Sequence, residues 1–119
     1  MENLNLKPYY IEGRGIYVPI INKVLAVENS CEGRRVPFEV AASKSVPTVR
    51  EWLIILFFKG EINIILRGLG KEPLRSGWYW SSSKDRTEQG SAWNVNLEDG
   101  TVRCDRCAYE DFAREVYSL

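Results

Sequence analysis

Apolar and polar residues alternate most regularly near the end of this 119-residue chain, over residues 92–97. A period of two predicts a half-buried β-strand with its apolar side chains inward and its polar side chains outward. The inward residues are Trp93, Val95 and Leu97, and the outward ones are Asn94 and Asn96. Asp99-Gly100 then tolerates positive φ, so a hairpin to a strand at 101–104 is expected. Further strands are expected at 78–80 and 113–117.

The first half of the chain predicts a hairpin followed by a short helix. Residues 16–18 and 23–27 are strand-like, and a short turn at 19–22 joins them. A helix is expected over 37–45, where a proline occupies the first turn.

The strongest helix signal begins at Thr48. Glu51 follows three residues later, so the two residues form a capping box in which each side chain accepts a hydrogen bond from the other's backbone N–H. This helix is expected to end at Gly60, and a shorter one is expected over 61–66. The residues expected on the buried face of the first helix are Trp52, Leu53, Leu56 and Phe57. We interpret this helical pair as scaffold.

Length and charge narrow the class of protein. One domain is expected over 13–119, preceded by an N-terminal extension at 1–12. The 16 basic and 16 acidic residues cancel, so no attraction to nucleic acid is expected. The apolar run at 54–58 is far shorter than the ~20 residues that span a bilayer, so membrane insertion is not expected. The first seven residues lack the apolar run of a secretory signal.

The three cysteines are an odd number, which disfavours a fully disulfide-stapled secreted domain. Cys104-x-x-Cys107 suggests a zinc site or a redox pair. A zinc site needs about four ligands, and the chain has no histidine and only one further cysteine. A thioredoxin-like pair belongs at a helix N-terminus, whereas this pair follows a hairpin strand. Ordinary surface cysteines are therefore favoured, and no metal or cofactor is expected.

The order strand–strand–helix–helix–strands, taken with three motifs, resembles a known bacterial family. The motifs are Val46-Pro47-Thr48-x-x-Glu51, Ser76-Gly77-Trp78-Tyr79-Trp80-Ser81-Ser82 and Ala92-Trp93-x-Val95-x-Leu97-x-x-Gly100. Over residues 13–117 the chain is similar to the C-terminal domain family of the Legionella collagen-like adhesin. The closing strand of that family usually reads Tyr-x-Val-Arg-Pro-Val, of which Arg114 and Val116 are matched here.

The resemblance implies an α+β, C-type-lectin-like fold, related to formylglycine-generating enzymes, with two short helices packed on a small, mostly antiparallel sheet. Similar domains occur in gut Bacteroides and in phages, where some are variable proteins diversified by retroelements. The calcium-binding Glu-Pro-Asn and Trp-Asn-Asp patterns of sugar-binding C-type lectins are missing here. Calcium-dependent sugar binding is therefore not expected.

The resemblance also implies a rigid β core that carries exposed C-terminal loops at 84–91 and 105–111. The expected core residues are Trp78, Trp80, Trp93, Val95 and Leu97. The loops would bind a macromolecular ligand, a protein or a glycan on a cell surface, without catalysis. The candidate ligand-binding residues are Asn94, Asn96, Arg103, Asp105, Arg106, Tyr109 and Glu110. Arginine and tyrosine are common in binding sites, although an ordinary surface also contains them.

Two alternatives stand beside ligand recognition. A structural or assembly subunit of a phage particle or surface appendage, including a homo-oligomer, would use strand edges to pair with another chain. An enzyme is not expected, because without histidine the Ser–His and Cys–His nucleophile–base pairs cannot form. A thiol-dependent oxidoreductase at Cys104 and Cys107 is the enzymatic alternative. The location expected from the sequence is the cytoplasm or a phage particle.

Overall fold

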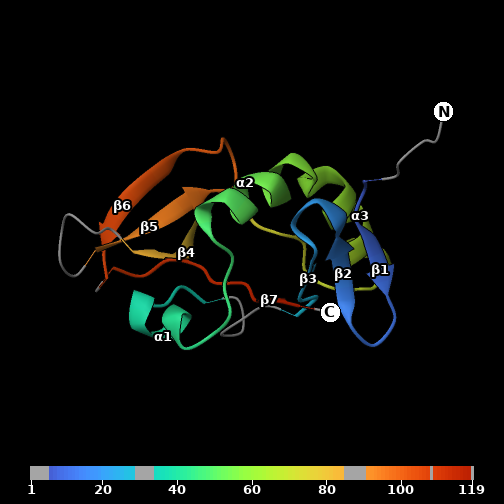
Figure 1. Ribbon diagram of the computed structural model, residues 1–119, viewed down its shortest axis with the longest axis horizontal. Helices are drawn as coiled ribbons and strands as arrows, with labels where there is room; N and C mark the ends of the chain where they lie inside the picture. Colours follow the sequence, from blue (N-terminus) through green and yellow to red (C-terminus); the bar gives the residue numbers. More distant parts are fainter. Residues whose placement is uncertain (1–5, 29–33, 85–90, 108, 119) are drawn as a thin grey trace.

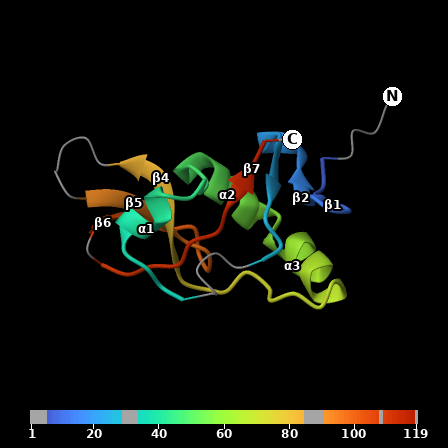
Figure 2. The same ribbon diagram turned by 90° about the horizontal axis from the view of Figure 1, so that it is seen from below.

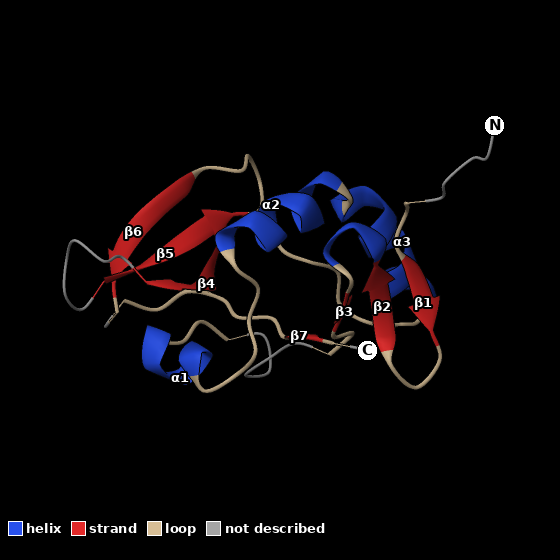
Figure 3. Cartoon of the chain, viewed as in Figure 1, coloured by secondary structure: helices blue, strands red, loops and turns tan. Residues whose placement is uncertain are grey.

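Two antiparallel sheets lie at opposite ends of the molecule, and a helix runs between them (Figures 1 and 3). The computed structural model describes residues 6–28, 34–84, 91–107 and 109–118. The fold is α+β, as the sequence predicts, and the described residues contain three α-helices, which correspond to the three that the sequence pattern predicts, where the resemblance implies two. The molecule measures 47 × 33 × 26 Å along its principal axes.

The first sheet is built mainly from the N-terminal part of the chain. Its strands are β1 (Tyr9–Ile11), β2 (Gly15–Val18), β3 (Lys23–Leu25) and β7 (Val116–Tyr117), in the order β1-β2-β3-β7. The expected hairpin of β2 and β3 is confirmed, and a 3-10 turn at Pro19–Ile21 closes it. From the sequence, residues 1–12 were expected to be an extension outside the domain. β1 lies in this stretch and pairs antiparallel with β2, so it is part of the first sheet.

The second sheet contains β4 (Trp78–Lys84), β5 (Ser91–Asn96) and β6 (Val102–Arg106), in the order β4-β5-β6. The expected hairpin of β5 and β6 is confirmed, and Gly100 in its turn has a φ of 79°. Phe112 lies along the outer edge of β4, where its N–H donates to the Trp78 carbonyl and its carbonyl accepts from the Trp80 N–H, each at 2.9 Å. A closing strand was expected at 113–117. Only the last two of these residues form a strand, β7, and it pairs with β3.

The helices are α1 (Phe38–Ala42), α2 (Val49–Phe57) and α3 (Lys59–Gly68). The capping box at the start of α2 is confirmed. The Glu51 N–H donates to Thr48 Oγ1 at 3.1 Å, and the Thr48 N–H donates to Glu51 Oε1 at 3.0 Å. Gly60 does not end α2 as expected, since the helix ends one turn earlier and Gly60 lies inside α3.

The buried face of α2 differs from the prediction. Trp52 and Ile55 are fully buried, while Leu53 is 39% exposed and Phe57 is 79% exposed. The sequence pattern did not decide between these faces, because apolar residues lie on all sides of α2. Contact with the two sheets selects the face that carries Trp52 and Ile55.

Two clusters of buried side chains form the core. In the larger cluster Trp52 of α2 packs on Tyr79 of β4, with ring centroids 4.9 Å apart. In the smaller cluster Phe38 of α1 packs edge-on against Trp80, with centroids 5.5 Å apart. Trp80 links the two clusters, because its carbonyl accepts a hydrogen bond of 3.0 Å from Trp52 Nε1.

The tryptophan-rich half of the chain forms part of the core, but not in every position expected. Trp80, Val95 and Leu97 are fully buried, as predicted. Trp78 and Trp93 are only half-buried, so part of each indole reaches the surface.

Within the described residues, no helix has both the length and the apolar character needed to cross a membrane.

Candidate functional site

Three exposed residues of the predicted site lie at the last residue of β6 and just beyond it, a surface called the turn after β6. Arg106, Tyr109 and Glu110 are all exposed, and Tyr109 keeps 54% of its surface accessible. The Tyr109 N–H donates to the Arg106 carbonyl at 2.9 Å, which closes the turn. The Phe38 N–H donates to the Cys107 carbonyl at 2.9 Å, so the turn is fixed to the start of α1. The prediction of an exposed C-terminal surface therefore holds for these residues.

Arg103 lies on β6 and is exposed, as predicted. Its guanidinium is 3.7 Å from the centroid of the Trp78 ring, a cation–π contact. The contact holds the charge against the sheet and covers part of the half-buried indole. Because this contact already orders the Arg103 side chain, Arg103 loses little conformational entropy when it makes a further interaction.

Asn94 was expected to face outward, and this prediction is wrong. The residue is fully buried, and its Nδ2 donates to Asp111 Oδ2 at 2.6 Å. The reason is that β5 is the central strand of its sheet and is covered on both faces. α2 covers one face, and α1 with the segment around Asp111 covers the other. Asn94 therefore holds this segment on the sheet and does not meet a ligand.

The other two predicted residues contribute little to a site. Asn96 is half-buried, and its Oδ1 accepts from the Glu98 N–H at 2.8 Å within the β5–β6 turn. Asp105 belongs to β6, but its side chain lies outside the described residues, as does most of the predicted loop at 84–91. Ser91, at the end of that loop, is buried.

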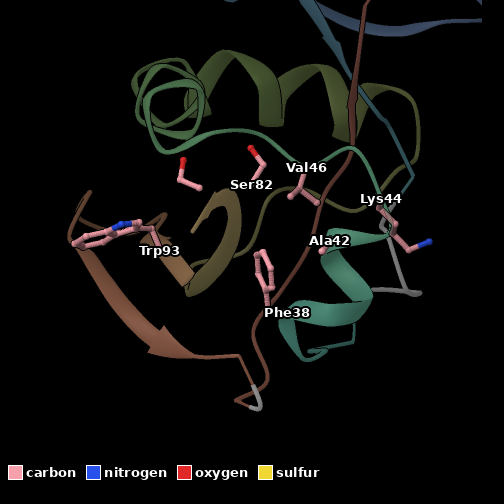
Figure 4. Close-up of a pocket in the computed structure, with 7 residues that line it drawn as sticks. Phe38, Ala42, Lys44, Val46, Ser82 and Trp93 are labelled. Carbon is pink, nitrogen blue, oxygen red and sulfur yellow. The ribbon is translucent and has the colours of Figure 1, made fainter. Parts of the chain in front are cut away.

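A pocket of about 560 Å³ lies between α1, the segment before α2, and the ends of β4 and β5 (Figure 4). Its lining residues are Phe38, Ala42, Lys44, Val46, Ser82, Ser83 and Trp93. The half-buried Trp93 and the buried Phe38 supply aromatic surface, and two serines of β4 supply hydroxyl groups. The Lys44 side chain extends away from the other lining residues in Figure 4. A ligand in the pocket would thus meet aromatic surface and hydroxyl groups.

A shallower hollow of about 330 Å³ adjoins the same tryptophan. It is lined by Val49, Ser83, Trp93 and Val102, so it lies between α2 and β6. Trp93 and Ser83 belong to both linings. Trp93 therefore lines both hollows, and a ligand in either one would lie beside it.

The pocket and the turn after β6 adjoin each other at α1. Phe38 lines the pocket with its ring, while its backbone N–H binds the Cys107 carbonyl in the turn. Sequence analysis missed the pocket, because its residues come from three separate segments of the chain. It had assigned Trp93 to the closed core, whereas Trp93 is only partly buried and lines the pocket.

Two groups with shifted pKa values, Tyr79 and Arg114, are enclosed in the fold and do not line the pocket. Burial raises the pKa of Tyr79, whose hydroxyl accepts from the Arg75 N–H at 3.1 Å. Burial lowers the pKa of Arg114, which is fully enclosed. Arg114 donates from Nε to the Ala26 carbonyl at 2.9 Å and from an Nη to the Val27 carbonyl at 3.1 Å. Arg114 thus joins the C-terminal segment to the end of the first sheet.

The two cysteines of the CxxC motif are partly buried and carry thiols. Cys104 lies opposite Trp93 in the β5–β6 ladder, whereas Cys107 packs against the smaller core cluster. Among the described residues, no three histidine, cysteine, aspartate or glutamate side chains are grouped as metal ligands.

No family model and no curated protein matches the chain. The fold and the site define a small α+β domain with an aromatic pocket beside an exposed turn. Its function has to be inferred from these residues.

Proposed function

We propose that this chain is a non-enzymatic recognition domain that binds a macromolecular ligand, a protein or a glycan on a cell surface. The observation that carries the proposal is the partly exposed Trp93, which lines two hollows together with serine side chains. A rigid aromatic ring with adjacent hydrogen-bonding groups is a common arrangement in binding sites.

The turn after β6 extends this surface. Arg106, Tyr109 and Glu110 add a cation, an exposed aromatic ring and a carboxylate beside the pocket. A small ligand would occupy the pocket alone, whereas a macromolecule also reaches the turn. The chemistry of both parts is that of contact and hydrogen bonding, and we assign no catalytic residue.

The proposal also includes the family of this chain and its biological role. The three sequence motifs support a place in the adhesin C-terminal domain family, with a C-type-lectin-like fold and a role as a diversified surface-binding protein. The exposed turn is a position where substitutions leave the core unchanged. Sequences of the gene from many strains test the idea of diversification. Non-synonymous changes confined to the codons of the turn are expected, and an even spread along the gene would exclude it.

The experiment that tests recognition is a screen of the full chain on glycan and protein arrays of host and bacterial surfaces. For a ligand found there, Trp93→Ala is expected to weaken binding by at least about tenfold, which is ~1.4 kcal/mol. Binding is measured by calorimetry, and circular dichroism checks that the variant folds.

Tyr10→Ala is the matched control for this test. Tyr10 is an aromatic residue, 40% exposed, on β1 in the other sheet. It is expected to leave the affinity unchanged. An affinity that Trp93→Ala also leaves unchanged would refute the proposed site, and arrays without any bound ligand would refute the proposed function.

A further inference from the structure

An apolar ridge follows the outward side of α2. Val49, Leu53 and Phe57 are spaced by four residues, so their side chains lie in one row along the helix. Exposure increases along this row: Val49 is half-buried, Leu53 is 39% exposed and Phe57 is 79% exposed. Single exposed apolar side chains are ordinary, whereas a contiguous row of them marks a surface that another molecule covers. The ridge is therefore a candidate contact surface.

A hollow that can receive a phenyl ring lies at the start of the same ridge. The hollow of about 330 Å³ between α2 and β6 is lined by Val49, Ser83, Trp93 and Val102. Most of this lining is apolar. Phe57 of the same chain does not reach it, because Phe57 lies eight residues after Val49, about 12 Å further along the helix. We propose that two copies of this chain associate through α2, with Phe57 of each copy in the hollow of the other.

A twofold axis at Leu53 brings the ring and the hollow together. When two antiparallel helices are related by such an axis, the residue four positions after Leu53 lies opposite the residue four positions before it. Phe57 of each copy then lies opposite Val49 of the other, at the margin of its hollow. The two Leu53 side chains meet at the axis. Every other contact is made twice, as in any twofold interface.

The same axis determines what the cation of the ridge would meet. Arg50 is exposed, and it lies three residues before Leu53. The position opposite Arg50 is therefore Leu56 of the other copy, three residues after Leu53. A Cβ added at Gly100 would lie 3.2 Å from Leu56 Cδ2, so the turn between β5 and β6 lies against this position, as Figure 1 also shows. Arg50 of each copy is thus directed to this turn of the other.

The turn between β5 and β6 carries the opposite charge. Glu98 and Asp99 are both exposed there, and Asp99 Oδ1 accepts from the Thr101 N–H at 2.9 Å within the turn. Arg50 of each copy would reach these carboxylates, which gives two ion-pair contacts in the dimer. The net charge of the chain is zero, so no overall repulsion opposes association of two copies. A surface that carries both the cation and the acidic turn favours a second copy of itself as the occupant.

The first test measures the contact at the twofold axis. Leu53→Cys is made in a chain whose three native cysteines are changed to alanine, and Ile64→Cys in the same background is the matched control. Ile64 is 69% exposed on α3, which lies beyond the end of α2 beside the first sheet (Figures 1 and 2). Oxidation with copper phenanthroline is expected to join two copies through residue 53 and not through residue 64, because a disulfide needs Cα atoms within about 7 Å. Equal yields from both variants, or no covalent dimer from Leu53→Cys, would overturn the proposal.

The second test keeps the native cysteines and measures the dimer dissociation constant by analytical ultracentrifugation under reducing conditions. Phe57→Ser is expected to raise this constant about tenfold or more, because the ring no longer fills the hollow of the other copy. The side chain is exposed in the single chain, so its loss is not expected to unfold the protein. Val40→Ser is the matched control, at an apolar residue that is 37% exposed on α1, and it is expected to leave the constant unchanged.

A third test uses the charges in the same measurement. Glu98→Arg places a cation near Arg50 of the other copy and is expected to raise the dissociation constant severalfold. The swap Arg50→Glu/Glu98→Arg restores opposite charges and is expected to restore most of the affinity. Position 50 lies in the first turn of α2, where a glutamate suits the helix dipole, so the swap does not weaken the helix. Arg67→Glu, at an exposed residue of α3, makes the same charge change as Arg50→Glu away from the ridge and is expected to have no effect.

A wild-type chain that stays monomeric at all concentrations would overturn the proposal, and a different protein would then have to cover the ridge. A dimer that Phe57→Ser leaves intact would also overturn it, as would a swap that associates no more tightly than Glu98→Arg alone. Circular dichroism of each variant separates loss of association from loss of folding. No ligand is present in these measurements, so their outcome is independent of recognition at Trp93.

Discussion

At the scale of single residues, the fold depends on a few polar groups that are enclosed together with their partners. Asn94 and Asp111 meet inside the molecule, and Arg114 is enclosed beside backbone carbonyls of the first sheet. A buried polar group is costly when its hydrogen bonds are removed. These residues are therefore important for stability.

Asn94→Ala removes the amide donor to the buried Asp111 carboxylate. We expect the free energy of unfolding to fall by about 1–3 kcal/mol, because a buried acceptor loses a hydrogen bond. Urea denaturation of the variant measures the change. Glu110→Ala, an exposed neighbour of Asp111, serves as the control and is expected to stay within ~0.5 kcal/mol of wild type. Equal stability of the two variants would argue against a structural role for Asn94.

Tyr79 makes the stability depend on alkaline pH. Burial raises its pKa above the ordinary value of 10.0, so the folded state retains the phenol proton when the unfolded chain has lost it. The unfolded state binds fewer protons in this window, and the free energy of unfolding therefore falls as pH rises above 10. Urea midpoints between pH 9 and pH 11.5 test this.

Tyr79→Phe removes the ionisable group and is expected to flatten that alkaline fall. Tyr109→Phe, at an exposed tyrosine, is expected to keep the wild-type slope. If Tyr79→Phe also kept the wild-type slope, the alkaline loss would have to come from other groups.

At the scale of elements, signals between neighbouring residues gave correct predictions. The capping box at Thr48 depends on two side chains three residues apart, and it forms as expected. The β5–β6 hairpin depends on a glycine with positive φ, which is also present. Such features need only local geometry, which the sequence contains directly.

Thr48→Ala removes the side-chain acceptor for the Glu51 N–H at the start of α2. The expected loss in the free energy of unfolding is about 0.5–2 kcal/mol, the usual effect of removing an N-cap. Thr48→Ser retains the hydroxyl and is expected to remain close to wild type. Chemical denaturation of the three proteins provides the comparison, and a loss of equal size in the serine variant would show that the methyl group matters rather than the cap.

Which face of an element is covered was not predictable from the same signals. Asn94 fits an alternating pattern that indicates an outward side chain, yet its strand is central and a segment of the C-terminus covers it. Phe57 fits a helical face, but no described element lies over it and it stays 79% exposed. These outcomes depend on partners far away in sequence. The pocket at Trp93 was missed for the same reason, while the exposed turn at Tyr109 was found because it follows a strand end.

At the scale of the whole molecule, one segment near the C-terminus joins the separate parts. Val36 and Asp111 pair through two backbone hydrogen bonds, and Phe112 then lines the edge of β4. Arg114 binds the end of the first sheet, and β7 adds a strand to it. The two sheets and the start of α1 are thus held by fewer than ten consecutive residues, from 111 to 117.

This arrangement has a kinetic consequence. Neither sheet can reach its final set of partners until the segment at 111–117 arrives, and most of the contacts that it makes span more than 70 residues of chain. Closing such long loops costs entropy before any contact repays it, so formation of the native state is expected to be slow for a domain of this size. The hairpins and helices would form early, and the docking of residues 111–117 would be the slow step.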